Sequence, residues 1–465
     1  MKIYDLAVVG AGPGGYVAAI RASSLGLKTV LIEKDTYPGG TCLNKGCIPT
    51  KILCHISEQY REAAKHKDIG IVSGELSLDI NVIQKRKSFV MDQLRKSLNH
   101  LISKKKIDLV YGEAEVLKNK TIQIKGNSSE DISADYILLA GGSKPVIPSS
   151  WKVDSSLLMT SDEILNFKAI PKTLLIIGGG VIGMEFASIF SSFGSKVTVV
   201  EALPTILPFE DQDISSELKR TFLKRKVTFY TSTKVGDIKK NSQSLQIRFD
   251  KSEGESFTES YESALIAIGR SPVLTGLENL DLEKKEKGSF LKVNDFYETS
   301  LPGFFAIGDI IGTTGLAHGA SAEGIIFAEK IAGLNPKPLN YHHIPSCIYT
   351  DPEIARVGLT EEKAREIHGD AIEIGKYPLR SIGKALITNQ IEGLVKIIIE
   401  KKYKEVIGIS LMGGHVTEMI AGHTIGLNLE STLEDWSNVV FPHPSLSEMV
   451  MECAKKMAGC GIHSL

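Results

Sequence analysis

A glycine-rich segment that occurs twice constrains the fold of this chain more than any other feature. The apolar run at residues 3–9 leads directly into Gly-Ala-Gly-Pro-Gly-Gly at residues 10–15. A second apolar run, at residues 174–177, leads in the same way into Gly-Gly-Gly-Val-Ile-Gly at residues 178–183. Each copy continues through a helical stretch and a further glycine into a second apolar run, and a glutamate directly follows that run. The sequence therefore predicts two strand–helix–strand units.

The two copies match residue by residue at a constant shift of 168 positions. The matching residues are Gly10, Gly12, Gly15, Gly26 and Glu33 in the first copy, and Gly178, Gly180, Gly183, Gly194 and Glu201 in the second. In this motif the first glycine allows a tight turn, the second lets a pyrophosphate approach the main chain, and the third lets the helix pack closely on the sheet. A single motif is a weak signal, but two in register predict two dinucleotide-binding sites.

The two glutamates indicate which dinucleotides these sites bind. Glu33 and Glu201 each lie at the end of the second strand, where a carboxylate can accept hydrogen bonds from a ribose diol. A carboxylate repels a 2′-phosphate, and no arginine closely follows Glu201, so the second site is predicted to bind NAD rather than NADP. Two nicotinamides cannot usefully exchange a hydride without a relay, so the first site is predicted to bind FAD.

Two cysteines, Cys42 and Cys47, lie just after the first strand–helix–strand unit. Five residues of helix rise about 7.5 Å, whereas bridged cysteines need Cα atoms within roughly 7 Å of each other. A disulfide between them therefore needs a distorted start of the helix, which Gly46 and Pro49 could shape. A strained bridge is easy to reduce, and a position near a helix start and Lys51 favours the thiolate form.

Two other interpretations of this cysteine pair remain open from the residues alone. The pair could form half of a zinc site with Cys54 and His55, or it could only pack in the interior. Zinc needs more ligands at short spacing, so we expect no metal. Packing is the expected role of Cys54, Cys347, Cys453 and Cys460, the last of which lies between two glycines close to the C-terminus.

Composition and charge argue against several other classes of protein. A chain of 465 residues is long enough for about three domains. Its formal net charge of -1 gives no electrostatic signature of a nucleic-acid or anionic-lipid partner. Its most apolar stretch is interrupted by glycines and Glu185, which argues against a membrane span. A strand starting at Ile3 leaves no room for a signal peptide, and only six cysteines argue against a secreted fold, so we expect a cytoplasmic protein.

Motifs along nearly the whole chain resemble the class I pyridine nucleotide-disulfide oxidoreductases, and most closely the dihydrolipoamide dehydrogenases. The motifs are GGTCLNKGCIPTK (39–51), ILLAGGSKP (137–145), IIGGGVIGMEFAS (176–188), LIAIGRSPV (265–273), FFAIGDIIG (304–312), LAHGASAEG (316–324), IPSCIYTDPEIARVGLTEEKA (344–364) and HPSLSEMV (443–450). The cysteine motif and the last histidine motif are highly specific for this family, whereas the glycine motifs are not. Gly141 stands where a threonine is common, and Phe441 replaces a histidine that often lies two residues before the catalytic one.

The resemblance implies an α/β fold with two Rossmann-like dinucleotide-binding domains and a C-terminal α+β dimerisation domain. The implied domains are an FAD-binding domain (1–143), an NAD-binding domain (144–271), a central domain that completes the FAD site (272–342) and an interface domain (343–465). The interface domain implies a homodimer.

The resemblance also assigns roles to individual residues. Cys42 would exchange with lipoamide, Cys47 would face the flavin, and His443 would act as a base that Glu448 orients. An imidazole suits this role because dithiol oxidation needs a proton acceptor near pH 7. The residues assigned to the FAD site are Gly10, Gly12, Gly15, Glu33, Lys51, Gly142, Asp309 and Ala317. Those assigned to the NAD site are Gly178, Gly180, Gly183, Glu185, Glu201, Gly269 and Arg270, and Lys51 would pair with Glu185.

The implied reaction is the oxidation of protein-bound dihydrolipoamide to lipoamide with reduction of NAD. The implied partners are the lipoyl domains and the acyltransferase core of 2-oxo acid dehydrogenase complexes, or a glycine cleavage system. A glutathione reductase would carry arginines in its nucleotide pocket, and a mercuric reductase would carry a vicinal cysteine pair near the C-terminus, where Cys460 stands alone. A non-catalytic flavoprotein would leave the cysteine pair, the histidine motif and both nucleotide sites unexplained together.

Overall fold

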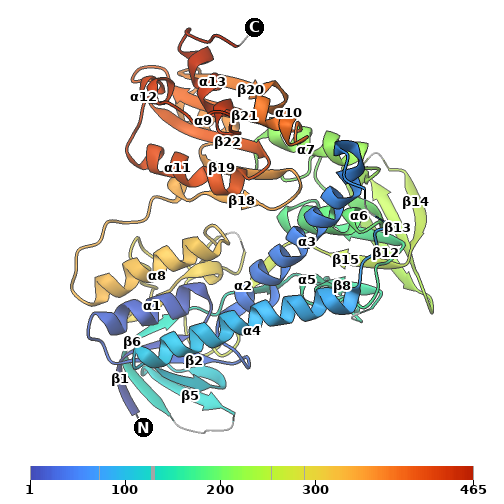
Figure 1. Ribbon diagram of the computed structural model, residues 1–465. Helices are drawn as coiled ribbons and strands as arrows, with labels where there is room; N and C mark the ends of the chain where they lie inside the picture. The colour runs from blue at the N-terminus through green and yellow to red at the C-terminus, as the bar shows by residue number, and fades with distance from the viewer. Residues whose placement is uncertain are drawn as a thin grey trace. The chain divides into compact units, whose positions relative to one another are not determined.

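The computed structural model describes residues 2–72, 74–126, 131–154, 156–252, 254–286 and 288–463. They form two compact units, each built from separate stretches of chain (Figure 1). The first unit comprises Met1–Leu53, Asp79–Pro148 and Gly269–Tyr341. The second comprises Cys54–Leu78, Ser149–Ile268 and His342–Leu465. The four domain limits expected from the sequence remain a prediction.

The first unit is built on a sheet with the strand order β3-β2-β1-β6-β5-β4, in which β17 also pairs with β6. The strands are β1 (Lys2–Val9), β2 (Thr29–Glu33), β3 (Asp108–Tyr111), β4 (Glu113–Val116), β5 (Thr121–Lys125), β6 (Ile132–Leu139) and β17 (Phe304–Ala306). The β1, β2, β3, β6 and β17 pairs are parallel, and all five residues of β2 are buried. Continuous apolar runs suit such strands because helices cover both faces of a parallel sheet.

Helices α1 (Pro13–Ser24) and α8 (Ala317–Ile331) lie side by side in this unit (Figure 1). Small residues allow the close approach, since a Cβ atom on Gly324 would lie 2.6 Å from the carbonyl oxygen of Gly14. The cysteine motif forms α2 (Gly40–Lys45) and the start of α3 (Cys47–Lys65), and α4 (Ile80–Lys104) follows. The strands β7 (Ser143–Pro145) and β16 (Arg270–Pro272) form a short antiparallel pair in this unit. The 3-10 helix η2 (Gly308–Ile311) contains Asp309.

The second unit contains a parallel sheet with the order β11-β10-β9-β15-β8. Its strands are β8 (Leu158–Thr160), β9 (Thr173–Ile177), β10 (Lys196–Val200), β11 (Thr228–Tyr230) and β15 (Ser263–Ile266). Helix α6 (Val181–Ser192) joins β9 to β10, and α7 (Gln212–Lys224) leads from β10 to β11. An antiparallel sheet of β12 (Thr233–Lys240), β13 (Leu245–Lys251) and β14 (Ser256–Tyr261) follows β11.

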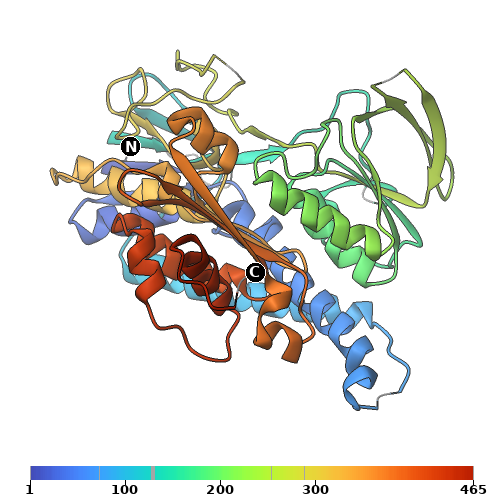
Figure 2. The same cartoon turned by 90° about the horizontal axis from the view of Figure 1, so that it is seen from above.

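The C-terminal part of the second unit is an antiparallel sheet with the order β18-β19-β22-β21-β20. Its strands are β18 (Ser346–Ile348), β19 (Glu353–Gly358), β20 (Ile372–Pro378), β21 (Leu394–Glu400) and β22 (Val406–Gly413). Both faces are buried: Ile397 and Ile399 pack with α11 (Val416–Asn428), α12 (Leu433–Asn438) and α13 (Glu448–Met457), shown in red in Figure 2. Ile398 faces α9 (Glu361–His368) on the other side. The predicted α/β fold class is confirmed.

Candidate active site and nucleotide sites

The first glycine of each motif adopts a main-chain conformation that other residues rarely adopt. Gly10 has a φ of +104° and Gly178 a φ of +110°. A Cβ atom on Gly10 would lie 2.3 Å from the carbonyl oxygen of Ala140, and one on Gly178 would lie 2.3 Å from that of Ala267. Both turns therefore require glycine, and both occur where a parallel strand ends and a helix begins.

The third glycine brings each helix against its turn. A Cβ atom on Gly15 would lie 1.9 Å from the carbonyl oxygen of Gly10, and one on Gly183 would lie 2.0 Å from that of Gly178. In the described structure no side chain caps α1 or α6, so the first N–H groups of each helix remain to bind an anion. This arrangement fits a dinucleotide pyrophosphate at each helix N-terminus.

The glutamate of each motif is held by the main chain of its own motif. The Glu33 carboxylate accepts one hydrogen bond from Ala11 N at 3.0 Å and one from Asp35 N at 2.8 Å. In the same way, the Glu201 carboxylate accepts one from Gly179 N at 2.7 Å and one from Leu203 N at 2.8 Å. Burial raises the pKa of Glu33. These bonds fix both carboxylates beside the glycine turns, as a ribose-binding role requires.

The chain breaks its helix between the two cysteines of the cysteine motif. Helix α2 ends at Lys45, Gly46 has φ and ψ of −149° and −105°, and α3 begins at Cys47. A Cβ atom at position 46 would lie 3.1 Å from the carbonyl oxygen of Thr41, so the break leaves little room for a side chain. Cys42 and Cys47 thereby come into hydrogen-bond contact. This is the distorted helix start that a bridge between these positions needs.

The two thiols differ in their electrostatic surroundings. The hydrogen bond with Cys47 raises the pKa of Cys42 strongly, and burial and the charge of Cys47 raise it further. The positive charge of Lys51 acts in the opposite direction on the same pKa. Cys47 occupies the first residue of α3, where the helix dipole favours a negative charge. When the pair carries one proton, we therefore expect it on Cys42, with the thiolate at Cys47.

Asp309 lies in η2, near enough to the cysteine pair for its charge to raise the pKa of Cys42. Its carboxylate accepts a hydrogen bond from the hydroxyl of Ser143. Arg270 donates to this hydroxyl at 2.8 Å and to the carbonyl oxygen of Ser143 at 2.7 Å. Gly269 and Arg270 thus belong to the first unit, and their expected role in NAD binding remains a prediction.

A buried glutamate that the sequence analysis missed holds the turn before Asp309. Glu323, in α8, accepts hydrogen bonds from Gly308 N at 2.6 Å, from the Thr313 hydroxyl at 2.8 Å and from the Tyr341 hydroxyl at 2.9 Å. Burial raises the pKa of Glu323, and these bonds favour its charged form. A glutamate within the apolar, small-residue helix 317–331 was the available signal.

Three further residues assigned from the resemblance have clear places in the fold. Gly142 has a φ of +68° and accepts a hydrogen bond from Val273 N at 3.0 Å. Ala317 is the first residue of α8. Glu185, buried in α6, accepts from Tyr349 N at 3.0 Å. Lys51 and Glu185 belong to different units, and their expected ion pair remains a prediction.

His443 and Glu448 form a hydrogen-bonded pair in the second unit. The Nδ1 atom of His443 lies 2.8 Å from a Glu448 carboxylate oxygen, and Ser445 N donates to the other oxygen at 2.9 Å. Burial acts to raise the pKa of Glu448, but the bonds from Ser445 and His443 bring it below its ordinary value. The His443 side chain is 78% exposed. The ring is thus oriented through one nitrogen while the residue stays open to a substrate.

A second histidine–glutamate pair joins Glu452, one turn after Glu448 in α13, to His463 beyond the end of that helix, and it was not expected from the sequence. The Nδ1 atom of His463 lies 2.9 Å from a carboxylate oxygen of buried Glu452, and the Tyr377 hydroxyl donates to the carbonyl oxygen of His463 at 3.0 Å.

Burial raises the pKa of Cys453 to about 12, which makes that thiol inert at neutral pH. In the part of the chain that the structure describes, no group of three or more potential ligand side chains could hold a metal ion.

Comparison with known proteins assigns the family. Residues 4–324 match the family described as pyridine nucleotide-disulphide oxidoreductase. The chain belongs to this family. Residues 344–454 match the dimerisation domain of the pyridine nucleotide-disulphide oxidoreductases, which corresponds to the C-terminal sheet and its helices.

Similar proteins extend over the whole chain. A dihydrolipoyl dehydrogenase of Bacillus subtilis is 40% identical, with 99% of each chain covered. A dihydrolipoyl dehydrogenase of Rhizobium etli is 38% identical, with 97% of each chain covered. Among solved structures, a Cu(II) complex of the HOCl-induced flavoprotein disulfide reductase RclA from Escherichia coli has a TM-score of 0.86 and 28% identity, and covers 98% of this chain and 100% of its own.

These similarities confirm the resemblance that the motifs indicated, both to the pyridine nucleotide-disulphide oxidoreductases and to the dihydrolipoyl dehydrogenases. The protein is an oxidoreductase that uses FAD and NAD(H), as expected from the two glycine motifs. Among the residues that the structure describes, no helix is both long and apolar enough to cross a membrane.

Proposed function

We propose that this protein oxidises protein-bound dihydrolipoamide to lipoamide and reduces NAD. The observation that carries the proposal is the Cys42–Cys47 pair, which the break at Gly46 brings into contact beside Asp309. The relatives named dihydrolipoyl dehydrogenase, which match over nearly the full chain, support the choice of substrate.

The cysteine pair would accept the two electrons of the substrate dithiol. Starting from the Cys42–Cys47 disulfide, a substrate thiolate attacks the Cys42 sulfur, forms a mixed disulfide and releases Cys47 as a thiolate. The second substrate sulfur then attacks the first, which closes the lipoamide disulfide and releases Cys42. The position of Cys47 at the start of α3 stabilises the thiolate that leaves. Bound FAD supplies the route by which the electron pair passes on to NAD.

His443 would accept the protons of the substrate thiols. Because the Glu448 carboxylate bonds to Nδ1, it holds the proton of the neutral ring there and leaves Nε2 as the acceptor. Glu448 also stabilises the imidazolium that forms, since its own pKa is below its ordinary value. We assign Glu448 the role of a positioning residue.

The proposed nucleotide contacts come from the two glycine motifs and from the resemblance to the family. The proposed FAD contacts are Gly10, Gly12, Gly15, Glu33, Lys51, Gly142, Asp309 and Ala317. The proposed NAD contacts are Gly178, Gly180, Gly183, Glu185, Glu201, Gly269 and Arg270. The preference for NAD over NADP is attributed to Glu201, whose carboxylate is fixed beside the second turn and would repel a 2′-phosphate.

The proposed working form is a cytoplasmic homodimer that accepts lipoyl domains. The dimerisation-domain match supports the dimer, and His443, the proposed base, lies among the residues that it covers. The proposed partners are the lipoyl domains and acyltransferase core of a 2-oxo acid dehydrogenase complex, or of a glycine cleavage system. Six cysteines in 465 residues fit a reducing compartment, in which the disulfide turns over.

Two assays on the FAD-loaded enzyme test the reaction. The first follows NAD reduction by dihydrolipoamide, and the second follows NADPH oxidation by glutathione disulfide. We expect rapid turnover in the first assay alone, and none with the Cys42→Ser variant, which retains Cys47 and whose FAD content and circular dichroism check that it is folded. Turnover in the second assay alone would establish a glutathione reductase instead.

A further inference from the structure

The loop between β10 and α7 packs directly on the glycine turn of the second motif. Gly179 lies between Ile206 and Glu201, since a Cβ atom on it would come within 3.0 Å of the first side chain and 3.2 Å of the second. Leu207 N donates to the carbonyl oxygen of Gly179 at 2.9 Å, and Ile206 and Leu207 are buried. A displacement of this loop, residues 202–211, would therefore move the turn and the glutamate that Gly179 holds.

The far end of the loop is held by the C-terminal sheet. Glu210 accepts a hydrogen bond from Arg356 of β19 at 2.9 Å and one from Ser346 of β18 at 3.1 Å. Its side chain is only 5% exposed, and Arg356 also donates to the carbonyl oxygen of Phe209 at 3.5 Å. Because Glu210 is shielded from solvent, dissolved salt screens the attraction between Glu210 and Arg356 only weakly.

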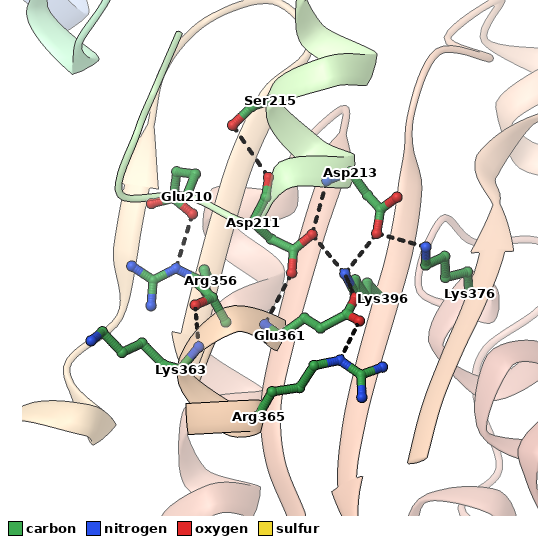
Figure 3. A network of polar contacts seen from close by, with 11 residues as sticks. Glu210, Asp211, Asp213, Ser215, Arg356, Glu361, Lys363, Arg365, Lys376 and Lys396 are labelled. Atoms are coloured by element: carbon green, nitrogen blue, oxygen red, sulfur yellow. Dashed lines mark hydrogen bonds and ion pairs between the residues drawn. The ribbon is translucent and has the colours of Figure 1, made fainter. Parts of the chain in front are cut away.

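Lys396, in β21, makes a second attachment at the same place (Figure 3). Its ammonium group contacts three carboxylates: Asp211 at 2.8 Å, Asp213 at 2.6 Å and Glu361 at 2.6 Å. The Lys396 side chain is 2% exposed. An ammonium has three N–H donors, and here each meets a charged acceptor. Burial acts to lower the pKa of Lys396, but the three carboxylates raise it above its ordinary value, so the lysine stays charged.

The same contacts fix the first turn of α7. Asp211 caps this helix by accepting from Asp213 N at 3.0 Å, and its other oxygen accepts from Glu361 N at 3.2 Å. Lys396 therefore joins the end of the loop, the start of α7 and the start of α9 in one cluster, in which Lys396 and Asp211 are buried (Figure 3). Removing the ammonium would leave buried Asp211 without a counter-charge, whereas Asp213 would keep Lys376 and Glu361 would keep Arg365. The carboxylates around the lost ammonium would then repel one another.

We propose that Lys396 and Arg356 are positioning residues for NAD. They hold the loop 202–211 against Gly179, and through it the glycine turn and Glu201 in the geometry that binds the dinucleotide. The proposal rests on the NAD site assigned above to Glu201 and the second glycine motif. It makes the affinity for NAD depend on two charged residues of the C-terminal sheet, which act through their contacts with the loop.

The Lys396→Met variant tests this dependence in the FAD-loaded enzyme. Isothermal titration with NAD should show an affinity reduced by roughly 3- to 30-fold, the range that such indirect substitutions produce. The KM for NAD should rise with it, whereas the KM for dihydrolipoamide and the FAD content should stay at the wild-type values. A general loss of structure would change all four quantities together.

Lys376→Met is the matched control. Lys376 lies on the neighbouring strand β20 and contacts Asp213 at 2.6 Å, but its side chain is 49% exposed and makes one of these ion pairs instead of three. Exposed pairs contribute little, so this variant should keep the wild-type NAD affinity. An equal loss of affinity in both lysine variants would overturn the proposal, because the cluster would then act only through its overall charge.

Two further variants make the outcome decisive. If Lys396→Met fails to fold, Arg356→Met removes the other attachment of the loop and should weaken NAD binding in the same selective way. Unchanged NAD affinity in a folded Lys396→Met or Arg356→Met enzyme overturns the proposal. Glu201→Ala separates the two hypotheses: if it leaves NAD affinity unchanged, the NAD site itself is wrongly assigned and the positioning role fails with it. If Glu201→Ala weakens binding and the two loop variants do not, only the positioning role fails.

Discussion

Glu33 and Glu201 make equivalent main-chain hydrogen bonds although 168 residues separate them. Each accepts one bond from the residue after the first motif glycine and one from the residue two positions beyond itself. The shared geometry means that differences between the two sites arise from the surrounding structure. Substitutions at the two glutamates can therefore serve as controls for each other.

Glu201→Ala should narrow the preference for NAD over NADP. Placing like charges next to each other costs several kcal/mol, so loss of the carboxylate should reduce the ratio of the two kcat/KM values by about tenfold or more. Glu33→Ala is the control, since it should weaken FAD retention and leave that ratio unchanged. Equal wild-type rates with both nucleotides would contradict the assignment of Glu201.

Gly178→Ala should destabilise the protein more than Gly194→Ala. Both glycines have a left-handed main chain, with φ of +110° and +99°. A Cβ atom on Gly178 would collide with the carbonyl oxygen of Ala267, whereas one on Gly194 would meet none of the described atoms within 4 Å apart from those of the glycine and its two chain neighbours. The free energy of unfolding of Gly194→Ala should therefore fall only by the cost of a left-handed main chain at a non-glycine residue, about 1–2 kcal/mol.

Denaturant unfolding of the two glycine variants, with NAD titration of the folded enzymes, measures this difference. Only Gly178→Ala should also weaken NAD binding, because only that substitution moves the turn. Equal unfolding free energies would mean that the turn relaxes around the new methyl group.

Glu448→Gln should change the acid stability of the protein as well as its activity. The folded chain lowers the pKa of Glu448 below its ordinary value of 4.5, so the ionised carboxylate stabilises the fold above that pH. This stabilisation is lost as the pH falls through the lower, folded pKa. The melting temperature of the wild type should thus fall more steeply below about pH 4.5 than that of the variant. Parallel curves of melting temperature against pH for the two proteins would contradict a lowered pKa of Glu448.

The sequence predicted those parts of the site that lie close together along the chain. The glycine motifs and the Cys42–Cys47 pair each join residues within one short segment, so their spacing constrains their geometry. The resemblance to the family indicated the His443–Glu448 pair, whose two residues are also close together along the chain. Lys396 and Asp211 are 185 residues apart, and their contact depends on how β21 lies against the start of α7. A single sequence specifies no such register between distant elements, which is also why the partners of Glu323 could not be predicted.

Mixing two inactive variants should restore activity if the working site is shared between two chains. The cysteine pair belongs to the first unit and His443 to the C-terminal part of the second, which matches a dimerisation domain. Most homodimers have two-fold symmetry, so a base from one chain can meet the disulfide of its partner twice. Cys42→Ser and His443→Gln chains should each be inactive alone, because proton transfer needs the base within hydrogen-bond reach of the sulfur.

In a heterodimer of these chains, one of the two sites carries both substitutions and the other carries neither. Random pairing makes half of the dimers mixed, so activity should recover to about a quarter of the wild-type value after subunit exchange. Differently tagged chains, purified in two affinity steps, would isolate the mixed dimer and should raise the recovery to about a half. A pure heterodimer without activity would show that the base and the cysteine pair of each site come from the same chain.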